Sequence, residues 1–210
     1  MNDYLNENEQ WDAIKRWWKK NGLQFFLLVI ISVSSGFGWR YWQAAQHNQK
    51  QEASQLFDQL LSVQNNTLDP TISDRIINEL EKNYPHTIYA SLAALFEAKS
   101  AVETNNLPKA AQQLQWALKT TKPPELKQII RVRLARILLA DQKPDQAMDL
   151  LGKTDSPGFS SIVSQIQGDI YLAKNQTDKA RTAYQNALNT MPASTLKTYV
   201  AMQLNQLPVE

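Results

Sequence analysis

The sequence predicts an all-α protein, in which a single N-terminal transmembrane helix precedes a solenoid of helical repeats. Three observations lead to this expectation. An uncharged stretch fills positions 21–39, apolar residues beyond it recur at intervals of three and four, and turn signals rich in Pro and Asn divide that remainder into segments of helical length. Only 6 Gly and 9 Pro occur among 210 residues, which suits a chain built from helices.

The first element is expected to be a transmembrane helix over residues 22–42. The 19 uncharged positions from Asn21 to Trp39 would span roughly 28 Å as a helix, close to the bilayer hydrocarbon thickness of about 30 Å. Aromatic rings favour the two membrane interfaces, and they flank this stretch at Trp17, Trp18, Trp39, Tyr41 and Trp42. A cleaved export signal is disfavoured, because the preceding twenty residues include four acidic ones and no small-residue cleavage site follows the apolar part.

Basic residues predict the orientation of this helix. Four precede it and two follow it closely: Lys15, Arg16, Lys19 and Lys20, then Arg40 and Lys50. Because the more basic flank stays in the cytoplasm, we expect residues 1–21 to form a cytoplasmic tail and residues 43–210 an exported domain. In a bacterium, this describes a single-pass, type II protein of the inner membrane with a periplasmic domain.

Two pairs of small residues, Ser32 with Gly36 and Ser34 with Gly38, stand one helical turn apart within the uncharged stretch. Such pairs allow another membrane helix to approach closely, so these four residues are candidates for helix–helix contact. Gly and Ser are also common in membrane helices that have no such partner, and the sequence leaves both interpretations open.

Beyond the membrane segment, the helices form pairs at a nearly constant spacing. Residues 44–64 and 72–83 are expected to form an atypical first pair. Ala110, Ala147 and Ala180 each open a short helix after a turn, at separations of 37 and 33 residues. A stripe of apolar residues at positions 196, 200, 204 and 207 predicts a terminal helix that caps the array.

The last unit carries the clearest motif, "GDIYLAKNQTDKARTAYQNALNTMP". It resembles the second two-thirds of the tetratricopeptide consensus, whose period is 34 residues. The matching positions, which we expect to govern the packing of the helix pair, are Gly168, Tyr171, Ala180, Tyr184, Ala187 and Pro192. In the consensus, Gly and Ala allow close crossing and Pro ends the second helix. We therefore expect residues 43–210 to form a tetratricopeptide-like solenoid.

No pattern in the sequence points to catalysis. The chain has no cysteine, two histidines without ligand spacing, and no glycine-rich nucleotide loop, so we expect neither an enzyme nor a bound metal or other cofactor. A net charge of +2 without a long basic run argues against a nucleic-acid partner.

The densest basic group lies on "ELKQIIRVRLARILL" and comprises Lys127, Arg131, Arg133 and Arg136. These residues are candidates for contacting a peptide or a carboxylate in the groove of the solenoid. The same pattern is also typical of a solvated helix face, and both interpretations remain open.

Two further segments extend the resemblance to a specific family. The acidic start "ENEQWDAIKRWWKKNG", the uncharged stretch and "GWRYWQAAQ" after it, together with degenerate tetratricopeptide units, resemble the ancillary SecYEG translocon subunits. The resemblance implies a non-catalytic inner-membrane protein that associates with the Sec export channel. It also implies contact with a periplasmic chaperone of the prolyl-isomerase type and with unfolded exported proteins, and a regulatory role for the tail in envelope stress.

Two other classes of function remain to be distinguished from this one. A tetratricopeptide scaffold for another envelope complex, serving division, cell-wall synthesis or cytochrome maturation, would share the same architecture. An enzyme would need an active site assembled from Asp, Glu, Lys and Tyr alone. The proteins that co-purify with the intact chain would separate the first two classes.

Overall fold

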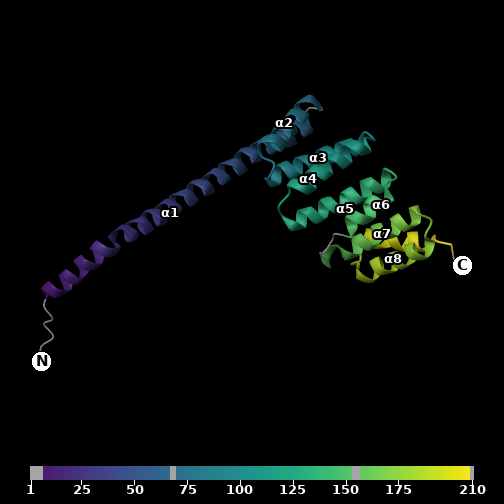
Figure 1. The fold of residues 1–210 in the computed structure, drawn as a ribbon. Coiled ribbons are helices and arrows are strands. Elements are labelled where there is room, and N and C mark those ends of the chain that lie inside the picture. Colours follow the sequence, from purple (N-terminus) through teal and green to yellow (C-terminus); the bar gives the residue numbers. More distant parts are fainter. Residues whose placement is uncertain (1–6, 67–69, 153–156, 209–210) are drawn as a thin grey trace. The chain divides into compact units, whose positions relative to one another are not determined.

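The computed structural model describes residues 7–66, 70–152 and 157–208 (Figure 1). All the secondary structure within these ranges is helical. The elements are α1 (Glu7–Asn66), α2 (Pro70–Asn83), α3 (Ile88–Glu103), α4 (Leu107–Thr120), α5 (Pro124–Ala140), α6 (Pro144–Leu151), the 3-10 turn η1 (Pro157–Phe159), α7 (Ser160–Ala173), α8 (Thr177–Thr190) and α9 (Thr195–Asn205). The chain divides into two compact units, Met1–Gln49 and Lys50–Glu210.

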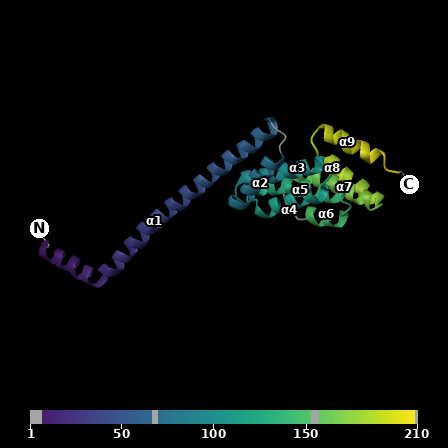
Figure 2. The same ribbon diagram turned by 90° about the horizontal axis from the view of Figure 1, so that it is seen from above.

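The first unit contains the greater part of α1, and many of its large apolar side chains are exposed. Among the described residues, no single helix has the length and apolar composition of a membrane span. The segments Ile14–Gln24 and Phe26–Val63, which meet at a bend of 45°, satisfy these criteria together (Figure 2).

The second unit begins with the end of α1, which packs against α2 and α3 through Ala53, Leu60, Ile76 and Leu80. Residues 44–64, the expected first helix of the atypical first pair, continue α1 without interruption. The reason is visible in the sequence, because the segment between Gly38 and Pro70 contains neither Gly nor Pro to end a helix.

Three helix pairs follow, α3 with α4, α5 with α6, and α7 with α8, and they share one turn geometry (Figure 1). Asn105, Gln142 and Asn175 adopt the left-handed conformation, with φ of 56°, 58° and 57°. In each turn, the next N–H reaches back across the helix end: Asn106 to the Ala101 carbonyl at 2.7 Å, Lys143 to Leu138 at 2.8 Å, and Gln176 to Tyr171 at 2.8 Å. These are Schellman-type ends, and they recur at the separations of 37 and 33 residues predicted from the alanines.

The core runs through the stacked pairs as a chain of local clusters. Ala110, Ala147 and Ala180, each the fourth residue of its helix, are completely buried. At the end of the array, α9 packs on α8 and buries Val200, which confirms the predicted terminal helix (Figure 2). The helix ends at Asn205, so Leu207 of the predicted stripe is buried just beyond it. Most helices contact the helices next to them in sequence, and α5 also contacts α7.

Candidate functional site

The hollow between α3 and α5 is the first candidate for a binding surface. It encloses about 350 Å³ and combines aliphatic walls with a charged rim. Its lining residues are Leu95, Ala98, Lys99, Val102 and Glu103 from α3, Leu114 from α4, and Arg133, Arg136 and Ile137 from α5. We call this surface the α3–α5 hollow. Its amphipathic lining suits a ligand that carries both an apolar group and a charge.

The charges around the α3–α5 hollow are only partly compensated. On the α3 side, Lys99 and Glu103 form an ion pair at 3.5 Å across one helical turn. On the α5 side, Arg136 donates a hydrogen bond of 3.0 Å to the Gln165 side-chain oxygen of α7. Arg133 is exposed and has no hydrogen-bond or ion-pair partner among the described residues. The rim therefore carries an excess of positive charge on its α5 side.

A chain of hydrogen bonds from α7 and α8 fixes the position of the Arg136 guanidinium. Gln165 is buried and donates from its amide nitrogen to the Asp169 carboxylate, which in turn accepts a hydrogen bond of 2.7 Å from the Tyr184 hydroxyl. Burial raises the pKa of Asp169, although the Tyr184 hydrogen bond and the charge of Arg136 both oppose this shift. Burial and the Asp169 hydrogen bond also raise the pKa of Tyr184. The network ties α5, α7 and α8 together and holds the guanidinium in place.

Gly168 makes room for the Tyr184 ring in this network. A Cβ built on Gly168 would lie 2.9 Å from Cζ of Tyr184 and closer still to Cδ1 and Cε1. The ring is 1% exposed and is therefore enclosed on its other sides as well. These two positions of the repeat motif pack directly against each other, whereas Ala180 and Ala187 are buried beside them.

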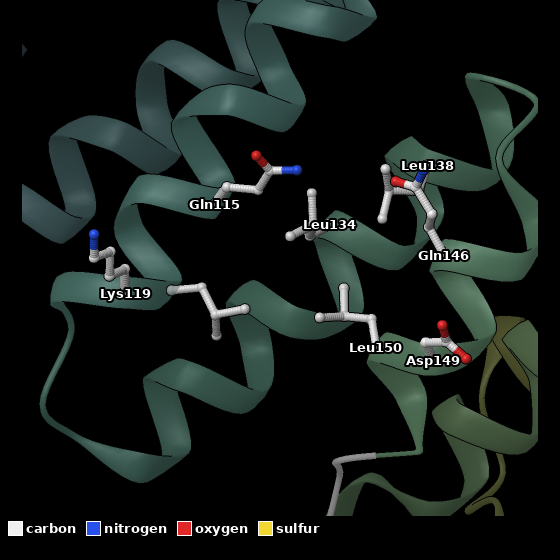
Figure 3. A pocket seen from close by; sticks show the side chains of 8 residues that line it. Gln115, Lys119, Leu134, Leu138, Gln146, Asp149 and Leu150 are labelled. Carbon is white, nitrogen blue, oxygen red and sulfur yellow. The ribbon is translucent and has the colours of Figure 1, made fainter.

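A second hollow lies between α4 and α6 (Figure 3). It encloses about 390 Å³, with four leucines, two glutamines and two opposite charges around it: Leu118, Leu134, Leu138 and Leu150, Gln115 and Gln146, Lys119 and Asp149. Figure 3 shows Leu134 and Leu150 between Lys119 at one side and Asp149 at the other. Because its rim carries one charge of each sign, this α4–α6 hollow offers no net electrostatic preference.

A third cluster of polar groups joins α2, α3 and α4. Glu97 is 8% exposed, and its carboxylate pairs with Lys109 at 2.8 Å. Burial and the negative charge of Glu97 raise the pKa of Glu81 from 4.5 to about 7. The Glu81 Oε1 atom is buried and lacks a hydrogen-bond partner within the described parts of the chain, as does Oε1 of Gln113. Between pH 4.5 and about 7, Glu81 therefore keeps its proton in the folded chain and loses it in the unfolded chain.

The structure divides the predicted basic group between two faces of α5. Arg133 and Arg136 line the α3–α5 hollow, whereas Lys127 and Arg131 do not. Arg131 instead donates to the Gln128 side-chain oxygen at 2.6 Å, and its Nε is buried without a partner among the described residues. Successive residues of a helix are rotated by about 100°, so positions 131 and 133 point away from each other. The peptide-contact role of all four residues remains a prediction.

The predicted membrane-contact residues all lie on α1. Ser32 and Ser34 are exposed, and the Ser32 hydroxyl donates to the Leu28 carbonyl at 2.8 Å within the same helix. Apart from the backbone of its own helix turn, no atom of the described residues lies within 4 Å of a Cβ built on Gly36, so a neighbouring helix would have access there. The contact role of Ser32, Ser34, Gly36 and Gly38 remains a prediction.

Sequence reasoning missed the aliphatic walls of the α3–α5 hollow and the cluster around Glu97. The walls come from three helices, and periodicity within one helix cannot show which faces will meet. Glu97 did carry a signal, because it is a lone charge within the apolar run "SLAALFEA" of α3. The described residues hold no group of three or more His, Cys, Asp or Glu side chains that could bind a metal.

Comparison with known proteins places this architecture in a family. A family model described as a tetratricopeptide repeat-like domain matches residues 15–209. The chain is 31% identical to the ancillary SecYEG translocon subunit of Escherichia coli (strain K12), over 100% of both chains. The chain belongs to the ancillary SecYEG translocon subunit family.

Other members of this family match at similar levels. The subunit of Aggregatibacter actinomycetemcomitans is 32% identical over 87% of this chain and 89% of its own, and that of Haemophilus influenzae is 31% identical over 97% and 98%. The resemblance noted in the sequence is thereby confirmed, and it extends over nearly the whole chain. The name that these relatives share describes an accessory subunit of a translocon.

Proposed function

We propose that this protein is a non-enzymatic, membrane-anchored accessory subunit of the Sec protein-export channel. The observation that carries the proposal is its full-length similarity to proteins named as ancillary SecYEG translocon subunits. The fold supports it, because stacked helix pairs provide extended binding surfaces. A Sec-associated protein belongs to the bacterial inner membrane, and we propose that location for this chain.

In this proposal, residues 22–42 cross the inner membrane. Large apolar side chains of α1 are exposed here, including Leu23 at 75%, Leu28 at 62% and Ile31 at 63%, and lipid would cover them. The excess of basic residues before the segment supports a cytoplasmic tail over 1–21 and a periplasmic repeat domain over 43–210. The anchor would keep the repeat domain at high local concentration beside the channel exit.

The repeat domain would receive newly exported, unfolded polypeptides and pass them to a periplasmic chaperone of the prolyl-isomerase type. The α3–α5 hollow is the surface that supports this role, because its walls are aliphatic and its rim is positively charged. The membrane helix would contact the channel through its small residues. Ser32 and Gly36 share one face, and Ser34 and Gly38 lie on the opposite face, so one pair is expected to dominate.

In-cell photocrosslinking tests this proposal. A photoreactive amino acid would replace Ser32, Ser34, Gly36 or Arg133 in the full chain, and mass spectrometry would identify the captured proteins. We expect Sec channel subunits from one of the two membrane faces, and a chaperone or nascent chains from position 133. The exposed Lys122, on the loop before α5, serves as the control for position 133.

Capture of division, cell-wall or cytochrome-maturation proteins without any channel subunit would overturn the proposal. That result would instead support a scaffold for another envelope complex.

A further inference from the structure

The α3–α5 hollow has an apolar surface that the fold leaves partly uncovered. Leu95 and Leu114 are almost fully buried and form its floor, whereas Val102 is 41% exposed and Ile137 is half-buried at the edge. A volume of about 350 Å³ lies at the lower end of the range for ligand pockets, and it suits a few side chains of an extended segment.

The charge on the rim restricts what such a segment can carry. Lys99 and Glu103 neutralise each other on α3, so neither gives the hollow a net charge. On α5, Arg133 and Arg136 stand three residues apart and therefore face the same way. Arg136 is already oriented by Gln165, and Arg133 has no partner within the described residues. Two guanidinium groups beside an aliphatic surface complement a carboxylate that follows an aliphatic side chain.

We propose that the α3–α5 hollow selects internal segments of exported polypeptides in which an aliphatic residue lies next to Asp or Glu. The aliphatic side chain would contact Val102 and Ile137, and the carboxylate would accept hydrogen bonds from Arg133 and Arg136. This proposal rests on the proposed function and adds the chemistry of the client segment to it. The α4–α6 hollow lacks this selectivity, because Lys119 and Asp149 balance each other there.

Peptide binding to the full chain in detergent micelles tests the proposal. Three fluorescent peptides, each acetylated and amidated at its ends, would carry the same Leu-Ile core followed by Asp-Glu, Asn-Gln or Lys-Lys. Because a hydrogen bond between a guanidinium and a carboxylate is stronger than one to a neutral amide, we expect the acidic peptide to bind about tenfold or more tightly than its amide counterpart. The lysine peptide is expected to bind most weakly.

Two variants on the same helix separate a specific contact from a general effect of charge. Arg133→Gln is expected to abolish most of the preference for the acidic peptide, and its exposed position leaves the core intact. Lys127→Gln removes the same charge from α5 outside the hollow and is expected to keep the preference. Circular dichroism would verify that both variants remain helical.

Several results would overturn this inference: equal binding of the acidic and amide peptides, no binding of any peptide, or an equal loss in both variants. The photocrosslinks from Ser32 and Ser34 report on the proposed function separately. Channel crosslinks without peptide selectivity would overturn this inference alone, whereas peptide selectivity without channel crosslinks would overturn the proposed function alone.

Discussion

Replacing Gly168 by alanine tests the packing of the last repeat. The new Cβ would collide with three atoms of the Tyr184 ring, which is 1% exposed and held by Asp169 through its hydroxyl. Overpacking costs typically about 1–3 kcal/mol, and a ring fixed at both ends belongs near the upper value. The better helix propensity of alanine returns about 1 kcal/mol. We therefore expect a net loss of about 2 kcal/mol in the free energy of unfolding.

Urea unfolding of the full chain in detergent, followed by far-ultraviolet circular dichroism, would measure this loss. The same change corresponds to a decrease in Tm of roughly 4–8 °C for a chain of this size. Gly152→Ala is the control, because the nearest atoms to its new Cβ are carbonyl oxygens at 3.6 and 3.8 Å, and it should change stability by less than about 0.5 kcal/mol. A Gly168→Ala chain as stable as the unmodified one would refute the reasoning. In a chain that already carries Tyr184→Leu, Gly168→Ala should reduce the free energy of unfolding by less, because the ring is absent.

Three further substitutions address other features of the fold. Because the folded state binds the extra proton at Glu81, stability should decrease as the pH rises from 4.5 to about 7; Glu81→Gln should flatten this slope in Tm measurements, whereas the exposed Glu79→Gln should not. Gln142→Gly should raise the urea midpoint by the equivalent of about 0.5–1 kcal/mol, since φ is 58° there, and an unchanged or lower midpoint would contradict this. Tyr184→Phe should cost about 1–3 kcal/mol by removing a buried hydrogen bond to Asp169, and full native stability would show that this bond contributes nothing.

The repeat could be read from the sequence because its signals are local. Turn residues near Asn105, Gln142 and Asn175 end one helix, and a buried alanine five positions later marks the next. The continuity of α1 was harder to recognise. Composition changes from apolar to polar after position 42, which suggests a boundary. A helix usually continues until a breaking residue ends it, and neither Gly nor Pro occurs between Gly38 and Pro70.

The sequence predicted the charged residues of the α3–α5 hollow but not its apolar walls. Arg133 and Arg136 stand out as a charged pair at helical spacing, and both line the hollow. Helical spacing also places Lys127 and Arg131 together on a different face of the same helix, and neither of them lines the hollow. The apolar walls depend on how α3 and α4 pack against α5, which is a tertiary property. Short-range patterns therefore identify the charged residues but not the apolar surface beside them that a ligand would contact.

The packing of most helices against their neighbours in sequence has a consequence for how the domain acquires its structure. Contacts that close over short stretches of chain have a low entropic cost, so folding is fast and can begin at either end. A polypeptide that emerges from a channel in the N-to-C direction could complete each helix pair as it arrives, without waiting for α9. A protein proposed to receive unfolded chains would then itself spend little time as one.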